Sequence, residues 1–308
     1  MMDTILNLGL NDQTVLSLGK KTKNLRFAKD SYRRFIQMYG NVVMGIESYN
    51  FEELIENYKL TKGVLLDNDL DENDWDGLIH DFKNLIKIKT KKEFPQNVNE
   101  QLLGSIGAVF LSWESKRAKT YRKLNQIPSS WGTAVNVQSM VFGNMGNDCA
   151  TGVVFTRSPS DGNNEIYGEY LINAQGEDVV AGSRTPQYIT KKTEKKSSSK
   201  KNSMEEIMPK VFNQLKKILK TLEKHYKDMQ DVEFTVENSK LWILQTRSGK
   251  RTPKSAIKIA ADMVKEKLIT KKEAILRINP NSLESLLHPT LDEKSKINVI
   301  AKGLPASP

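Results

Sequence analysis

The stretch Asp231-Val-Glu-Phe-Thr-Val-Glu-Asn-Ser-Lys-Leu-Trp-Ile-Leu-Gln-Thr-Arg247 decides the fold expected for the second half of this 308-residue chain. It consists of two apolar runs in which hydrophobic residues alternate with polar ones. Between the runs stand Asn238 and Ser239, and both residue types favour tight turns. The stretch therefore predicts a β-hairpin.

This hairpin would gather four polar side chains on one face. A turn centred on Ser239 places Glu233 opposite Gln245 and Asp231 opposite Arg247, and alternate residues of a strand share a face. Carboxylate and amide oxygens are hard ligands suited to Mg²⁺, and a guanidinium can neutralise nucleotide phosphates. The alternative is an ordinary half-exposed hairpin with an Asp231–Arg247 ion pair. Register is decisive, because a slip of one residue moves the set to the other face.

A glycine-rich segment from Gly143 to Gly152 lies between two predicted strands. Such a loop can bring backbone N–H groups close to phosphate oxygens, with Thr151 as a further donor. Gly143, Gly146, Thr151 and Gly152 are therefore candidate phosphate-binding residues. The segment lacks the Gly-Lys-Ser/Thr of a Walker loop, and no helix follows it as in a dinucleotide fingerprint. A plain hairpin turn is the alternative.

Two further segments are candidates for other parts of a nucleotide site. Between Gly168 and Gly182, a predicted strand leads into an acidic loop, where Glu169 or Glu177 could meet a metal or a ribose. A solvated carboxylate is the alternative for both. The hydrophobic segment 135–141 could line an adenine pocket, and a core strand explains it equally well.

Outside these motifs, the spacing of apolar residues predicts the architecture. Helical periodicity is found in Asn11–Thr90, Asn97–Leu124, Met204–Tyr226 and Ser255–Ile278. Strand patterns are found in Ala134–Phe142, Thr151–Thr156, Ile166–Ile172 and Val232–Val236. Helices thus precede a group of strands with an intervening helix, and more helices follow, which is the order of an α+β fold.

Composition bounds the function classes. The sequence contains no apolar run of roughly eighteen residues, which is the length needed to cross a membrane. The N-terminus also lacks a signal-peptide pattern, so a cytoplasmic location is expected. One cysteine, Cys149, and three scattered histidines form neither a disulfide nor a zinc pattern. The net charge of +10 suits an anionic ligand. The charge alone also suits a nucleic-acid-binding protein, which is a second alternative, but nucleic acid is not the expected partner because no recognised binding motif is present.

Part of the positive charge is concentrated between Lys191 and Lys201, where lysines crowd around three consecutive serines. This composition indicates a solvated loop, because runs of like charge repel themselves. An electrostatic binding site is the alternative.

Several segments together resemble the pyruvate, phosphate dikinase family. They are Met1-Met-Asp-Thr-Ile-Leu-Asn-Leu-Gly-Leu-Asn11, Trp131-Gly-Thr-Ala-Val-Asn-Val-Gln138, Met140-Val-Phe-Gly-Asn-Met-Gly146, Ala150-Thr-Gly-Val-Val-Phe-Thr-Arg157, Ile172-Asn-Ala-Gln-Gly-Glu-Asp-Val-Val-Ala-Gly182 and Leu244-Gln-Thr-Arg247. The resemblance implies a partial ATP-grasp-like nucleotide-binding domain, with ATP as ligand and Mg²⁺ as cofactor. It implies that Glu233 and Gln245 hold Mg²⁺, that Asp231 supports them, and that Arg247 lies beside the phosphates.

Other parts of the family pattern do not occur in this sequence. Family enzymes have a swivelling domain whose histidine carries the phosphoryl group, and a barrel domain that works on pyruvate and phosphoenolpyruvate. Here Gly303-Leu-Pro-Ala-Ser-Pro308 resembles only the opening of the swivelling domain. A family segment ahead of Met1, with a lysine and an arginine that hold ATP phosphates, is also missing. No catalytic residue is therefore assigned.

We expect an ATP-binding fragment of a phosphotransferase that converts ATP, phosphate and pyruvate to AMP, pyrophosphate and phosphoenolpyruvate. The fragment is not expected to complete the reaction alone, so companion chains with the missing domains are candidate partners. A non-catalytic remnant or regulatory module is the alternative. The predicted domains are a helical subdomain (1–95), an ATP-grasp-like region (96–250), a helical linker (251–300) and the start of the swivelling domain (301–308).

Overall fold

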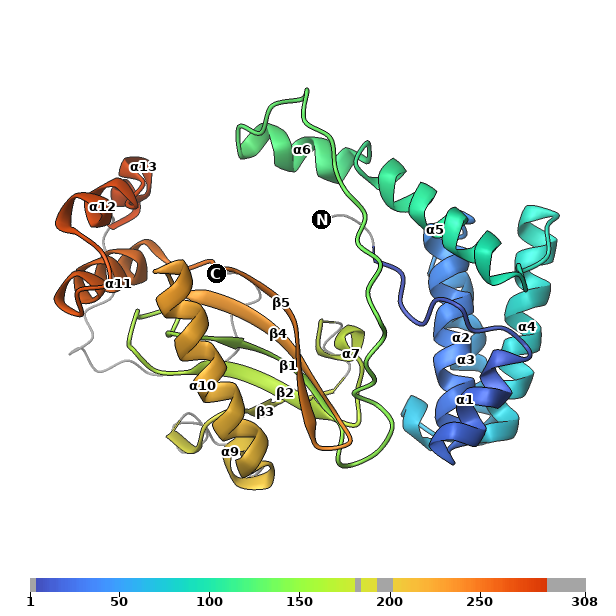
Figure 1. The fold of residues 1–308 in the computed structure, drawn as a ribbon. Coiled ribbons are helices and arrows are strands. Elements are labelled where there is room, and N and C mark those ends of the chain that lie inside the picture. Colours follow the sequence, from blue (N-terminus) through green and yellow to red (C-terminus); the bar gives the residue numbers. More distant parts are fainter. Residues whose placement is uncertain (1–3, 181–183, 193–201, 287–308) are drawn as a thin grey trace, which may run out of the picture. The chain divides into compact units, whose positions relative to one another are not determined.

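The computed structural model describes residues 4–180, 184–192 and 202–286. The chain divides into two compact units, Met1–Met140 and Val141–Pro308. Each unit has a hydrophobic core of its own. In Figure 1 the first unit runs from blue to green and the second from green to red.

The first unit is helical, as predicted for Asn11–Thr90. Its elements are α1 (Thr14–Thr22), α2 (Leu25–Val42), α3 (Tyr49–Lys62), the 3₁₀ helix η1 (Asp67–Asp69), α4 (Glu72–Thr90), α5 (Val98–Ser112) and α6 (Lys116–Leu124). Asp71 caps α4 by accepting hydrogen bonds from two backbone N–H groups of its first turn. Gly63 ends α3 with a φ of 69°, a left-handed conformation that glycine adopts without strain.

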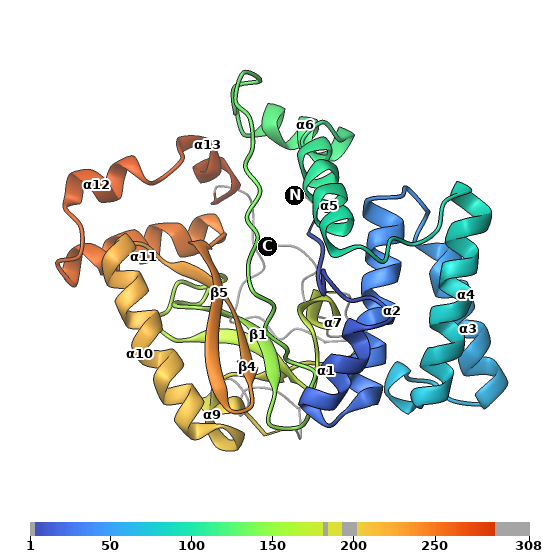
Figure 2. The same cartoon turned by 45° about the vertical axis from the view of Figure 1, so that its right-hand side comes forward.

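The core of this unit lies between α2 and α4, which run side by side (Figure 2). Phe35 on α2 and Trp75 and Phe82 on α4 are fully buried. Phe51 on α3 packs edge-on against Phe82, with 4.9 Å between the ring centroids. The apolar periodicity of the sequence thus predicts the packed faces of these helices.

A buried ion-pair cluster lies on α2. Asp30 accepts hydrogen bonds from Arg33 at 2.5 Å and from Arg34 at 3.2 Å. Burial alone would raise the pKa of Asp30, but Arg34 and Arg33 outweigh it and lower this pKa to about 2. Asp30 is therefore ionised in the folded protein at neutral pH.

The helix predicted for Asn97–Leu124 is wrong as one element, because it is broken between Ser112 and Lys116. Ser115 starts the second helix by accepting a hydrogen bond from the N–H of Ala118. A serine hydroxyl that caps a helix start competes with helix continuation.

The second unit is built on one antiparallel sheet of five strands in the order β3-β2-β1-β4-β5. The strands are β1 (Ala150–Phe155), β2 (Tyr167–Ile172), β3 (Gln187–Tyr188), β4 (Gln230–Glu237) and β5 (Lys240–Ser248), and the short helix α7 (Gly176–Val180) follows β2. This mixture of helices with one antiparallel sheet confirms the α+β prediction. The strand predictions near β1, β2 and β4 are confirmed, whereas Ala134–Phe142 is not a strand. That segment is extended but pairs with no strand of the described chain, and strand structure requires such pairing.

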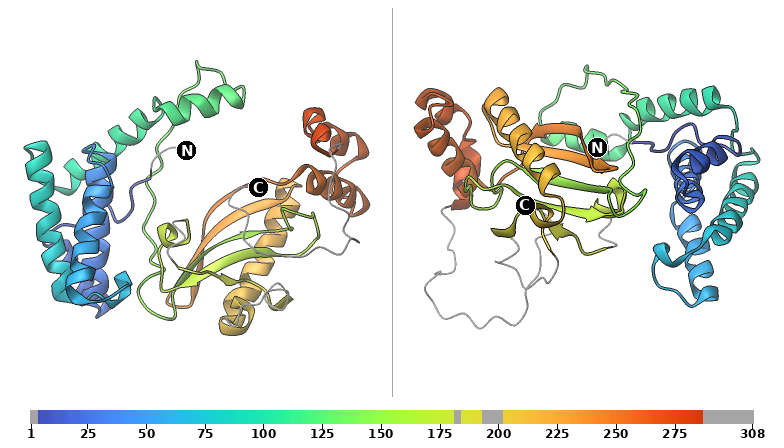
Figure 3. Two further views of the ribbon diagram at one scale, coloured as in Figure 1. Left: turned by 180° about the vertical axis from the view of Figure 1, so that it is seen from behind. Right: turned by 60° about the horizontal axis from the view of Figure 1, so that its bottom comes forward.

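One face of the sheet is covered by a helix, as Figure 3 shows from behind. The predicted helix Met204–Tyr226 is two helices, α9 (Met204–Ile207) and α10 (Pro209–Tyr226). Pro209 causes the break, because proline has no N–H to donate and disfavours helical backbone in the residue before it. The apolar side of α10 packs against alternate residues of β4, namely Val232, Phe234 and Val236. The opposite face of β4 is therefore left for polar side chains.

Short helices follow β5. They are α11 (Pro253–Lys265), α12 (Lys271–Leu276), α13 (Pro280–Leu283) and the 3₁₀ helix η2 (Glu284–Leu286). The helical structure predicted for Ser255–Ile278 is confirmed, but it is divided into two helices, because the chain turns between Lys265 and Lys271. Lys267 has a φ of 60°, and Thr270 caps α12.

Arg157, two residues after β1, ties these helices to the sheet. Its side chain is fully buried. It donates hydrogen bonds to Glu223 of α10 at 2.8 Å and to Glu266 at the end of α11 at 2.5 Å. A buried charge is tolerated only when it is paired in this way. One guanidinium therefore joins β1, α10 and α11.

Several sequence expectations fall on residues outside the described ranges, namely 301–308 and most of the lysine-rich segment. Of that segment, Lys191 lies 3.7 Å from Glu206, and Lys192 pairs with Glu165. Across the described helices, none is both long and apolar enough to cross a membrane.

Candidate functional site

The hairpin of β4 and β5 has the predicted pairs. Asp231 lies opposite Arg247, and Glu233 lies opposite Gln245. The predicted turn residues are confirmed, but the turn is centred between them and not on Ser239. Asn238 and the residue after it are the two turn residues, with φ of 49° and 62°, and the strands close on either side of them. Positive φ at both positions is typical of a two-residue hairpin turn of type I′.

A β-bulge reconciles this turn with the predicted pairs. Phe234 lies opposite Ile243 while Glu233 lies opposite Gln245, so Leu244 is one extra residue on β5. Without the bulge, the turn would place Glu233 opposite Leu244. The bulge therefore shifts the far half of β5 by one residue and brings its polar side chains onto the face of the β4 carboxylates.

The four predicted side chains lie together on the sheet face that points away from α10. Nε of Arg247 donates a hydrogen bond of 2.7 Å to Oδ2 of Asp231, and its Nη2 lies 3.7 Å from Oε1 of Glu233. The hydrogen bond to Asp231 raises the pKa of Arg247, so the guanidinium stays charged. Arg247 and Glu233 are 57% and 40% exposed, and both can reach a ligand.

Asp231 is the buried member of the set, with 8% of its side chain exposed. Its Oδ2 is paired with Arg247, but its Oδ1 is buried without a hydrogen-bond partner in the described chain. A buried carboxylate oxygen without a partner is costly unless a ligand or an ion satisfies it. This atom is the clearest sign that the face receives another group.

The donor chemistry of the face fits Mg²⁺. Glu233 and Gln245 offer a carboxylate and an amide oxygen on neighbouring strands, and Mg²⁺ is commonly bound by one or two carboxylates together with substrate phosphates. No group of three or more His, Cys, Asp or Glu side chains placed to hold a metal occurs among the described residues.

Glu169 extends this polar face across the sheet. Val153 of β1 lies opposite both Glu233 and Glu169, so these two residues share a face on strands whose backbones are about 10 Å apart. Burial raises the pKa of Glu169, whose carboxylate makes no hydrogen bond or ion pair within the described residues. Glu177, the other acidic candidate, is half-buried on α7, which packs on β1 and β2.

The glycine-rich segment is divided between a loop and a strand. Gly143 packs tightly against backbone, because its carbonyl accepts a hydrogen bond from Ala174 N at 2.9 Å and an added Cβ would clash there. Gly152 lies within β1, where an added Cβ would come within 2.6 Å of Glu169 O. Gly146 stays in the loop, and its carbonyl accepts a hydrogen bond from Cys149 N.

Thr151 also lies in β1 and not in the loop. Its side chain is buried, and its hydroxyl donates to Phe234 O at 3.3 Å beside the hydroxyl of Thr235. The hydroxyl is therefore satisfied inside the sheet.

The hairpin turn is attached to this loop, which the sequence did not indicate. Ser239 N donates to Asp148 O at 3.0 Å, and Asn238 N donates to Sγ of buried Cys149 at 3.3 Å. Glu237 accepts a hydrogen bond from Phe142 N at 3.0 Å. The loop and the hairpin thus form one connected edge of the site.

Trp242 is a second feature that sequence reasoning missed. It lies opposite Thr235, which shares the face of Glu233, and it is 37% exposed. The ammonium of Lys240 lies 4.0 Å from the centroid of its ring. Alternation counted back from Gln245 would have placed Trp242 on the opposite face, and the bulge at Leu244 brings it onto the polar face.

Comparison with known proteins finds relatives of one family over the whole chain. The family model described as the pyruvate phosphate dikinase AMP/ATP-binding domain matches residues 1–214 and 191–268. The chain is 58% identical over 308 residues to the pyruvate, phosphate dikinase of Rhizobium meliloti (strain 1021), and 53% identical over 311 residues to that of Clostridium symbiosum. It is 51% identical over 310 residues to the chloroplastic enzyme of Flaveria trinervia. Each match covers 100% of this chain and 34%, 34% and 31% of the relatives, so the chain spans about a third of their length.

Proposed function

This chain belongs to the pyruvate phosphate dikinase family through its AMP/ATP-binding domain, and we propose on that basis that the polar face of the hairpin binds ATP with Mg²⁺. The observation that carries the proposal is the arrangement of Asp231, Glu233, Gln245 and Arg247 on one sheet face, with Oδ1 of Asp231 buried and unpaired. An ATP-grasp-like fold is part of the proposal. The antiparallel sheet, with α10 on one face and these residues on the other, supports it.

Each side chain has a separate role in this proposal. Glu233 and Gln245 hold Mg²⁺ through their oxygens, and the ion, when bound, neutralises phosphate charge. Asp231 supports them from its buried position. Arg247 stays charged and half-exposed, so it can pair with phosphate oxygens while Asp231 fixes its orientation.

The loop that holds the hairpin turn forms the second part of the proposed phosphate site. Gly146 is half-buried beside the exposed Asn147 and Asp148, where backbone N–H groups can approach a phosphate. Gly143, Thr151 and Gly152 contribute from behind, because the two glycines allow close backbone packing and Thr151 is bonded inside the sheet.

The relatives are named for a reaction of pyruvate and phosphate, and this chain corresponds to about a third of their length. We propose that the chain supplies the nucleotide step of that reaction, in which positioning and charge neutralisation do most of the work. Transfer onward to pyruvate would then need the remaining domains, in the same protein or in companion chains. A cytoplasmic location fits this role.

Calorimetric titration of the purified chain with ATP and Mg²⁺ tests the proposal. Saturable binding by the wild type is expected, and the double variant Glu233→Ala, Gln245→Ala should lose it. A matched control carries Glu53→Ala and Gln214→Ala, the same two kinds of change at exposed helix positions away from the hairpin. Absence of binding by a folded wild type, or equal binding by all three proteins, would contradict the proposal.

A further inference from the structure

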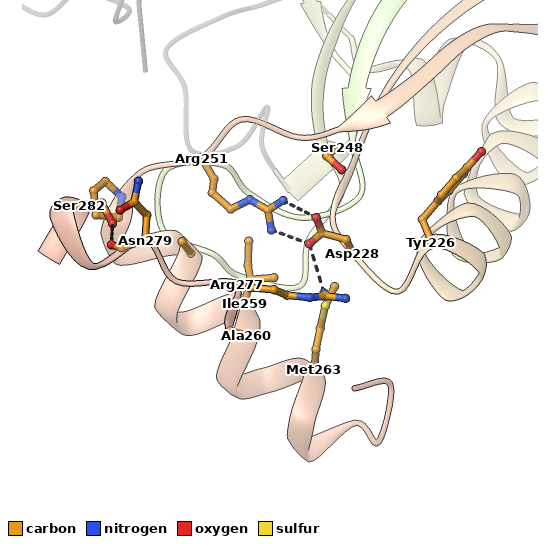
Figure 4. Close-up of a pocket in the computed structure, with 12 residues that line it drawn as sticks. Tyr226, Asp228, Ser248, Arg251, Ile259, Ala260, Met263, Arg277, Asn279 and Ser282 are labelled. Atoms are coloured by element: carbon orange, nitrogen blue, oxygen red, sulfur yellow. Dashed lines mark hydrogen bonds and ion pairs between the residues drawn. The ribbon is translucent and has the colours of Figure 1, made fainter. Parts of the chain in front are cut away.

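A pocket of about 510 Å³ opens at the end of the second unit, where α10, β5 and α11 meet (Figure 4). Its volume falls in the range of sites that bury a small organic molecule. Its walls come from the β4 entry, the β5 exit, one face of α11 and the chain around α13.

The pocket lies apart from the proposed nucleotide face. Ser248, which lines it, lies opposite Gln230, whereas the preceding Arg247 lies opposite Asp231. Because neighbouring residues of a strand point to opposite faces, Ser248 and Arg247 point away from each other. A ligand in this pocket would therefore not occupy the polar face.

Two guanidiniums and one carboxylate line the pocket. Arg251 donates from Nη1 and Nη2 to Asp228, each at 2.8 Å, and from Nε to Gly249 O at 2.9 Å. Arg277 approaches the same carboxylate at 3.7 Å, as Figure 4 shows. The described lining thus carries two positive charges and one negative charge, a net charge of +1.

Arg277 is the cation that remains available. Its Nη1 donates to Lys227 O at 2.6 Å, and about a third of its side chain is exposed. A guanidinium has five N–H donors, and within the described chain those on Nε and Nη2 of Arg277 have no partner. Arg251, by contrast, is held rigid by Asp228 and supplies a fixed positive wall.

The rest of the lining is mixed, with Ser248, Asn279 and Ser282 as polar members and an apolar stretch on α11. Ala256, Ile259 and Met263 are spaced so that they share one face of α11, and all three line the pocket. Figure 4 shows Ile259 and Met263 on this helix. Tyr226, half-exposed, stands at the opposite wall. Ile259 and Met263 also belong to the buried core of this unit, so the pocket borders on apolar side chains that are held in place.

We propose that this pocket binds a small organic anion in which a carboxylate or phosphate is attached to an apolar or aromatic body. The charged group pairs with Arg277 beside the Arg251–Asp228 pair. The body packs on the apolar stretch of α11 against Tyr226.

The test is calorimetric titration of the full chain at low salt with phenyl phosphate and with benzoate, which separate the two head groups. Benzyl alcohol and inorganic phosphate serve as the body alone and the head alone. At least one aromatic anion should bind saturably and at least tenfold more tightly than either part. Arg277→Gln should weaken this binding at least tenfold, and Ala256→Phe, which fills the pocket and keeps both arginines, should abolish it.

Controls keep the result specific. Lys272→Gln removes one exposed cation from α12, and Ile257→Phe adds bulk to α11 outside the pocket, so neither should change the affinity. The Glu233→Ala, Gln245→Ala variant should also bind the anion normally, which separates this proposal from that of the nucleotide face. Thermal unfolding confirms that each variant is folded. No saturable binding by the wild type, or binding unchanged by both pocket variants, would overturn the proposal. If Ala256→Phe loses binding while Arg277→Gln binds as tightly as the wild type, the proposal that the ligand is an anion is overturned.

Discussion

Arg247 and Asp231 face each other across the hairpin, and Nε of Arg247 donates a 2.7 Å hydrogen bond to Oδ2 of Asp231. The carboxylate is buried, whereas the guanidinium is more than half exposed. Asp231 therefore depends on this arginine for a partner inside the protein. The arginine keeps further donors for a ligand.

Replacing the arginine should destabilise the chain through the aspartate. Arg247→Gln leaves the buried carboxylate without its cation, and we expect the free energy of unfolding to fall by about 2 kcal/mol. Adding Asp231→Asn should recover most of this loss, because the pair is then replaced by neutral groups. Urea unfolding of the two single variants and the double variant measures the coupling. Additive losses would show that the pair does not stabilise the fold.

The hairpin turn offers a gain in stability. Ser239 has a φ of 62°, where a side chain is strained and glycine is not. Ser239→Gly should raise the free energy of unfolding by about 1 kcal/mol, and its N–H can still donate to Asp148. Ser239→Val should lower stability, because a β-branched side chain fits this conformation poorly. Chemical denaturation of the three proteins decides the order, and a less stable glycine variant would contradict the turn geometry.

Asp30 predicts an acid-dependent loss of stability. Its pKa is about 2 in the folded protein against an ordinary 3.8. A lowered folded-state pKa stabilises the fold at pH above the unfolded value, and this contribution disappears as the pH falls from about 4 to 2. Asp30→Asn should therefore cost about 2 kcal/mol at pH 7 and progressively less in that acid window.

Urea unfolding of Asp30→Asn and the wild type between pH 7 and pH 2 measures this difference. Glu53→Gln, at an exposed position on α3, is the control and should show no pH-dependent difference. If the difference in unfolding free energy between Asp30→Asn and the wild type stays constant with pH, the carboxylate does not stabilise the fold through its lowered pKa.

Glu169 predicts a pH dependence of stability opposite in sign to that of Asp30. Burial raises its folded-state pKa above the ordinary 4.5, so the native state binds more protons than the unfolded chain between these two values. Stability therefore falls as the pH rises through this window, and the penalty is fully present above the folded-state pKa.

Glu169→Gln should thus be more stable than the wild type at pH 7, and the difference should vanish below about pH 4.5. Thermal unfolding at a series of pH values measures it. Equal stability of the wild type and Glu169→Gln at pH 7 would show that burial of the charged Glu169 carboxylate does not destabilise the fold.

The sequence predicted the hairpin, its pairs and three of the strands, because alternating apolar residues and a turn pair are local signals. It named the two turn residues but centred the turn on Ser239 and not between Asn238 and Ser239, and the pairs were right because the bulge at Leu244 compensated. A bulge depends on how two strands twist against each other, and no single residue type predicts that twist.

Other features were not predictable because they depend on distant partners. Ala134–Phe142 has a strand-like composition, but no described strand lies beside it to pair. Thr151 has a donor hydroxyl, but β4 supplies its acceptor. The helix breaks at Ser115 and Pro209 did have local signals, namely a capping serine and a proline. The apolar periodicity continues across both positions, and it therefore predicted one helix in each case.

The bulge at Leu244 also divides the hairpin into two halves with different tolerance for a new turn. On the turn side, the N–H groups of Asn238 and Ser239 hold the neighbouring loop, so a replacement turn has to keep both donors. On the far side, Gln245 and Arg247 lie opposite β4 in a register that is counted from the turn. An engineer could accordingly exchange the turn only for another of two residues, because a longer or shorter one would shift every pair beyond the bulge.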